Sequence, residues 1–143
     1  MTLHTFHQWA SLIVLLTSCG FALSFGGRPE RLSAVAMILA WFASAVLMRA
    51  AREAGLDIAV MTVDIVLFLV VLAISLTSDR WWPMWASAFL GLIVLVHLAV
   101  MLDPKIWGRA YFAASNLFSY LTMFALLIGS LSRASGQRQT SAP

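Results

Sequence analysis

The sequence predicts an all-α integral membrane protein, a bundle of five transmembrane helices joined by short loops. Of its 143 residues, 62% are hydrophobic and 10% are charged, against about 45–50% and about 25% in ordinary soluble domains. The apolar residues fall into five runs of roughly the length, about 20 residues, that a helix needs to cross about 30 Å of hydrocarbon. Most tryptophans lie near the ends of these runs, where amphipathic rings prefer the membrane interface.

The predicted helices are placed from the apolar runs and from the residues that end them. Asp57 can cap the third helix, and Pro83 lies in the first turn of the fourth, where its missing N–H costs nothing. Pro104 stops the fourth helix. A Ser-, Gly-, Gln- and Arg-rich tail over 132–143 is predicted to be disordered. The five helices are expected over residues 8–25, 32–51, 57–77, 82–102 and 110–131.

Cys19 is the single cysteine, which excludes an internal disulfide and a thiolate metal cluster within one chain. It lies in a short stretch, residues 16–20, that resembles a bacterial lipoprotein cleavage site. A secretory leader should begin with positive side chains, yet no Lys or Arg precedes Arg28, and the apolar run continues past the cysteine. A retained transmembrane helix is therefore predicted over lipidation after cleavage.

The orientation follows from counting Lys and Arg in the short loops. With the N-terminus outside, the cytoplasmic side holds five of them: Arg28, Arg31, Arg80, Arg133 and Arg138. The other side holds four: Arg49, Arg52, Lys105 and Arg109. This small excess favours N-out and C-in. The compact chain and its Ala and Arg usage indicate a bacterial source, and hence the cytoplasmic (inner) membrane.

Asp64 and His97 are the titratable side chains deepest in apolar sequence, on the third and fourth predicted helices. Asp64 lies about 15 residues before the corner at Asp79 and Arg80, and His97 about 17 after it, so their depths differ by only about 3 Å. Counted from the connection between the fourth and fifth helices, around residues 103–107, Asn116 on the fifth helix lies at a depth similar to that of His97. Tyr120 lies one turn further on the same stripe. These residues are predicted to form one polar layer.

An ionised Asp in the middle of a bilayer costs about 2.5–3.5 kcal/mol on insertion scales, so Asp64 needs a partner or a proton. His97 is the preferred partner. Arg49, whose long side chain can reach inward from the second helix, is a rival, and a bound ligand or a second subunit is the remaining choice. The layer is interpreted either as a proton-responsive or ligand-binding site or as polar contacts that only fix helix packing.

Cofactors are not expected. Haem held by two histidines needs two at comparable depth on different helices, and His97 alone lies deep, because His4 and His7 precede the first helix. No phosphate loop, nucleophile elbow or zinc-protease pattern is present. The sequence has no stripe of basic residues of the kind that would indicate nucleic-acid binding. Membrane lipids are the expected surroundings.

Loops of three to eight residues leave no room for a catalytic site outside the membrane, so the protein is predicted not to be an enzyme. The first functional prediction is an accessory or structural subunit that packs against itself, as a homo-oligomer, or against a larger membrane complex. The alternative is a small carrier, channel or proton-linked sensor that uses the layer of Asp64, His97 and Asn116. A third interpretation, an enzyme acting on lipid or quinone, has only that layer in its favour.

Overall fold

The computed structural model describes residues 3–54, 58–102 and 109–140. These residues form five α-helices: α1 (Leu3–Phe25), α2 (Arg28–Ala54), α3 (Ile58–Thr77), α4 (Trp82–Leu102) and α5 (Arg109–Thr140). The predicted all-helical fold with short connections is therefore present in the described part of the chain.

Four of these helices are long and apolar enough to cross a membrane, over Arg28–Leu47, Ile58–Thr77, Trp82–Leu102 and Ala110–Ala134. The described apolar part of α1, Trp9–Phe25, is shorter. The outer surface of the bundle is rich in large apolar side chains, and Leu39, Leu76 and Leu102 are among those more than half exposed. Such a surface suits hydrocarbon better than water.

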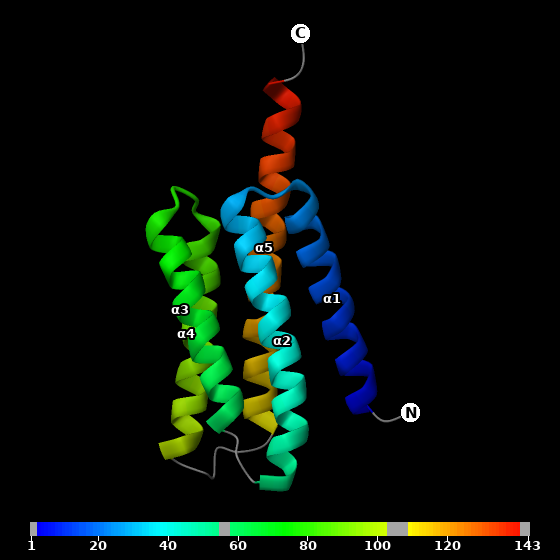
Figure 1. The fold of residues 1–143 in the computed structure, drawn as a ribbon, viewed down its shortest axis with the longest axis vertical. Coiled ribbons are helices and arrows are strands. Elements are labelled where there is room, and N and C mark those ends of the chain that lie inside the picture. Colours follow the sequence, from blue (N-terminus) through cyan, green and yellow to red (C-terminus); the bar gives the residue numbers. More distant parts are fainter. Residues whose placement is uncertain (1–2, 55–57, 103–108, 141–143) are drawn as a thin grey trace.

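The helices lie side by side with their long axes roughly aligned (Figure 1). Each packs against its neighbours in the chain, and α1 also packs against α5, so contacts run round a closed ring from α1 to α5. A smaller contact between α2 and α5 crosses this ring. The corner at residues 26–27 and the corner at residues 78–81 lie at the same end of the bundle, which the last turns of α5 overshoot (Figure 1).

The helix α2 begins at Arg28, four residues before the predicted start. Pro29 fits the first turn of a helix, where a backbone N–H has no partner to lose. The Glu30 carboxylate reaches back to accept a hydrogen bond from the Gly27 N–H at 2.8 Å. This is the glutamate half of a capping box, so the residues interpreted as a loop instead start the helix.

The predicted disordered tail is wrong for residues 132–140, where α5 continues as helix to Thr140. No proline interrupts this stretch, and its Ala, Arg and Gln residues are good helix formers. Extending a helix that already exists is far easier than starting one. Residues 141–143 lie outside the described residues.

Glu30 joins the two corners at one end of the bundle. Its side chain is fully buried. Oε1 accepts a hydrogen bond from the indole N–H of Trp82 at 3.1 Å and lies 3.6 Å from Nε of Arg80. Trp82, expected at the membrane interface, is instead 1% exposed, because its ring packs over Gly129 of α5. This contact holds the start of α4 against both α2 and α5.

The packing of Trp82 on Gly129 predicts that Gly129→Ala destabilises the fold. A Cβ at this position would overlap the buried indole, and such overpacking costs about 1–3 kcal/mol. Gly20→Ala is the matched control, because a Cβ at Gly20 meets nothing within 4 Å. Gly20→Ala should stabilise the fold by up to about 1 kcal/mol, because alanine has a higher helix propensity than glycine. Unfolding in detergent measures both variants, and equal stabilities would contradict the packing described.

Candidate functional site

Asp64 of α3 and His97 of α4 lie in contact near the end of the bundle opposite Glu30. Nε2 of His97 is 2.8 Å from Oδ2 of Asp64. The side chain of His97 is 7% exposed and that of Asp64 is 22% exposed. The pair forms because α3 and α4 are an antiparallel hairpin, in which residues equally far from the corner reach equal depth. His97, the preferred partner, is therefore the group that Asp64 contacts.

Tyr111 of α5 adds a third member that sequence reasoning missed. Its hydroxyl lies 3.0 Å from Nδ1 of His97, and the two rings pack edge to face with centroids 5.4 Å apart. The signal that could have found it is its distance from His97 in the sequence, since both lie close to the connection that joins α4 to α5.

Asn116 and Tyr120 do not join this group. Asn116 is exposed and Tyr120 is half-buried, and no hydrogen bond joins either one to Asp64 or His97 among the described residues. At about 100° per residue, Asn116 lies about 140° round α5 from Tyr111, and Tyr120 about 180°. Neither residue faces the pair of Asp64 and His97 as Tyr111 does. The side chain of Arg49, the rival partner, lies outside the described residues.

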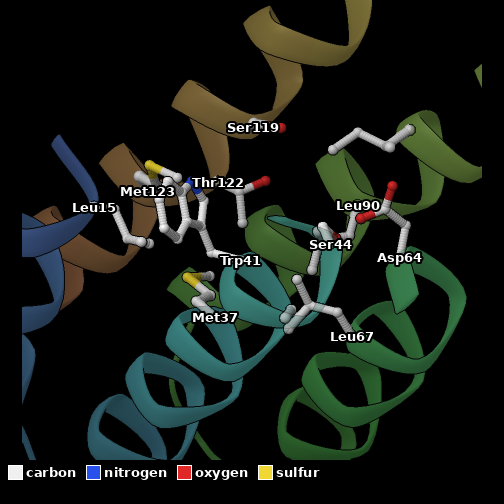
Figure 2. A pocket seen from close by; sticks show the side chains of 12 residues that line it. Leu15, Met37, Trp41, Ser44, Asp64, Leu67, Leu90, Ser119, Thr122 and Met123 are labelled. Carbon is white, nitrogen blue, oxygen red and sulfur yellow. The ribbon is translucent and has the colours of Figure 1, made fainter. Parts of the chain in front are cut away.

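A pocket of about 190 Å³ lies inside the ring of helices, with Asp64 in its wall (Figure 2). In this view Asp64 is at one side and Leu15 at the other, with Trp41 between them and Met37 below Trp41. Asp64 is the one ionisable side chain in a lining that is otherwise apolar or hydroxylic. All five helices contribute to it: Leu15, Met37, Ala40, Trp41, Ser44, Asp64, Leu67, Leu90, Ile93, Ser119, Thr122 and Met123.

The volume of the pocket limits what it can hold. A dry cavity of about 150 Å³ accommodates benzene, whereas sites for drug-sized ligands are about 300–1,000 Å³. The pocket of about 190 Å³ therefore fits a molecule of about one aromatic ring with a small substituent. Thr122 also lines this pocket and brings a hydroxyl group to it. It lies about 20° from Tyr111 round α5, so the two side chains point to the same side of the helix.

The three side chains can gain or lose one proton without breaking a hydrogen bond. With His97 neutral, its Nε2–H donates to Asp64 and its Nδ1 accepts from the Tyr111 hydroxyl. With His97 protonated, Nδ1–H donates instead, and the hydroxyl, which can donate or accept, becomes the acceptor. The three side chains therefore form a continuous hydrogen-bonded chain from Tyr111 to Asp64, which lines the pocket.

Metal binding finds no support in the part of the chain that the structure describes, where no three His, Cys, Asp or Glu side chains gather as ligands would. Comparison with known proteins finds no matching family model, no matching curated protein and no matching solved structure.

The contact of Asp64 with His97 predicts energetic coupling between the two. In a double-mutant cycle with Asp64→Asn and His97→Gln, the coupling free energy should be about 0.6–1.7 kcal/mol, the range measured for polar contacts between membrane helices. Reversible unfolding in mixed detergent micelles gives the four stabilities required.

The matched control for that cycle is Asp79→Asn, the same change at an exposed carboxylate in the corner between α3 and α4. Combined with His97→Gln, it should be additive within about 0.5 kcal/mol. Additivity for the Asp64 pair as well would contradict a stabilising hydrogen bond between Asp64 and His97.

Proposed function

We propose that the protein is an integral membrane protein in which all five helices cross the bilayer. Four helices have the required length and composition, and the described apolar part of α1, at 17 residues, lies at the short end of the range that spans a bilayer. We further propose the cytoplasmic membrane, with the N-terminus outside. Arg28 and Arg31 of α2 and Arg133 of α5 line one pocket at the corner between α1 and α2, so this orientation places all three on the cytoplasmic side, as the excess of positive charge favours.

Within that membrane, the protein is proposed to act as a small proton-linked carrier or sensor of a compact organic cation. The observation that carries this proposal is the position of Asp64. One carboxylate oxygen contacts the His97 and Tyr111 chain, while the same side chain lines a pocket built by all five helices. The pocket thus offers a ligand one anionic group in apolar surroundings, connected to a proton-exchanging imidazole.

Proton and ligand should oppose each other at this site. With His97 neutral the pair of Asp64 and His97 carries one negative charge, and with His97 protonated it carries none. A cation in the pocket favours the negative form, because opposite charges attract more strongly in apolar surroundings than in bulk water. Binding of the cation therefore expels a proton, and uptake of a proton expels the cation. A carrier would use this exchange to couple two gradients, and a sensor would use it to report pH or ligand.

The exposed position of Asn116 favours the other candidate function. This candidate is an accessory subunit that packs against itself or against a larger complex. The Asn116 amide is exposed on the outer surface of α5, inside a stretch apolar enough to span a membrane. A polar side chain facing lipid finds its hydrogen bonds most readily on another helix. Phe112 and Leu117, also exposed, lie close to it in the sequence and would extend such a contact.

The proposal predicts that benzylammonium binds the pocket and that its neutral isostere, benzyl alcohol, binds more weakly. Asp64→Asn should weaken benzylammonium about 10- to 100-fold, since a buried hydrogen bond to a charged group contributes about 1.5–3 kcal/mol. The same change should leave benzyl alcohol within about threefold. Calorimetric titration of the purified protein, in buffers of different ionisation enthalpy, measures the affinity and the protons released together.

Asp79→Asn is the matched control and should bind both probes as the wild type does, because Asp79 lies in the corner between α3 and α4. Uptake of benzylammonium into vesicles, driven by a proton gradient and lost in Asp64→Asn, would identify a carrier; binding without uptake would identify a sensor. Failure of both probes to bind, with Asp64→Asn changing only assembly, would contradict the proposal and favour the accessory subunit.

A further inference from the structure

A second pocket lies at the opposite end of the bundle, where α1 turns into α2. Its volume is about 340 Å³. It is built by the last turn of α1, the corner at residues 26–27, the first turn of α2 and one side chain from α5. Its lining is strongly basic: Ser24, Phe25, Gly26, Gly27, Arg28, Arg31 and Arg133.

The three arginines come together from distant parts of the chain. Arg28 and Arg31 are three residues apart on α2, a spacing that places them on one side of the helix. Arg133 reaches across from α5, and its guanidinium lies so close to Gly27 that a Cβ there would overlap it. Glycine at this corner therefore lets the guanidinium approach the backbone. Arg133 is half-buried, whereas Arg28 and Arg31 are exposed.

The positive charge of this pocket is only partly offset by carboxylates among the described residues: a Cβ at Gly27 would meet both the Arg133 guanidinium and Oε2 of Glu30, so these two groups lie near each other. Glu30, beside the pocket in sequence, is fully buried, accepts hydrogen bonds from Gly27 and Trp82 and has Arg80 as its ion-pair partner. No ion pair joins Arg28, Arg31 or Arg133 to a described carboxylate. Three arginines thus line one cavity with a single described carboxylate beside them, and that carboxylate already contacts Gly27, Trp82 and Arg80.

We propose that this pocket binds a phosphate group. Guanidinium groups present paired N–H donors that match phosphate oxygens, and each bond is strengthened by charge on both sides. Phosphate carries enough charge and enough acceptors to engage three arginines at once. This binding is separate from the pocket at Asp64 and does not depend on the function proposed for it.

Two sources can supply the phosphate, and the surroundings suit the headgroup of an anionic lipid. The pocket lies at the end of the apolar stretches of α1 and α2, where lipid headgroups would meet a bundle that spans the membrane. Phe25 lines the pocket and is 51% exposed, and its ring lies beside that of Phe21, with centroids 5.8 Å apart. An acyl chain could follow these rings while its phosphate contacts the arginines. A soluble phosphate would use the arginines alone.

The test uses the full chain in nonionic detergent with three probes: phosphatidic acid, phosphatidylcholine and inorganic phosphate. Retention of lipid is measured by native mass spectrometry, and the shift in melting temperature is measured for each probe. The variants are Arg133→Gln and Arg31→Gln. Arg31 is exposed, so its replacement tests the pocket even if Arg133→Gln weakens the fold. The matched control is Thr77→Glu, which lowers the charge of the same end by one at an exposed position outside the pocket.

Phosphatidic acid should be retained by the wild type and by Thr77→Glu, and at least fivefold less by Arg133→Gln and Arg31→Gln. That result supports the phosphate site and identifies a lipid as its source. Stabilisation by inorganic phosphate, lost in the same two variants while lipid has no effect, supports the site with a soluble source. Equal losses in Thr77→Glu and the arginine variants would show general charge attraction and overturn the proposal, as would no effect of any probe on the wild type.

Discussion

The placement of one carboxylate, Asp64, inside an apolar bundle is the constraint on which the functional site depends. An unpaired charge in such surroundings is costly, so the fold has to supply hydrogen-bond partners at the same depth. It does so through His97, 2.8 Å away on the next helix, and Tyr111, which contacts the far side of the imidazole. Because these three residues come from α3, α4 and α5, satisfying one carboxylate also sets how three helices pack.

The two ends of the bundle handle buried charge in different ways. At the corners between α1 and α2 and between α3 and α4, Glu30 is fully enclosed, with one arginine and two N–H donors. That arrangement is closed and suits a structural contact. Asp64 remains 22% exposed and lines a pocket, so it can still meet another molecule. The difference between an enclosed and an accessible carboxylate is the physical reason why we propose a functional role for Asp64 and a structural one for Glu30.

Much of this architecture follows from the sequence, because hydropathy and helix rise determine where apolar helices lie and how deep each residue sits. The depths of Asp64 and His97 could be counted from the corner at Asp79 and Arg80 for that reason. Direction around a helix is harder to predict, since it depends on which neighbours each helix meets, and Asn116 accordingly faces outward. Glu30 was missed because its neighbours resemble a loop, although it is the capping residue of α2. The two pockets could not be predicted, since each is formed by several helices meeting.

The proposed coupling requires that His97 holds a proton which a ligand at Asp64 displaces. Nitrogen-15 NMR of the imidazole in lipid measures this most directly, with the His97→Gln spectrum identifying its signals. On addition of benzylammonium, the two ring nitrogens should move from the pattern of imidazolium toward that of neutral imidazole with the proton on Nε2. Ring nitrogens that stay unchanged on saturation with benzylammonium, at every pH across the titration of His97, would contradict the account.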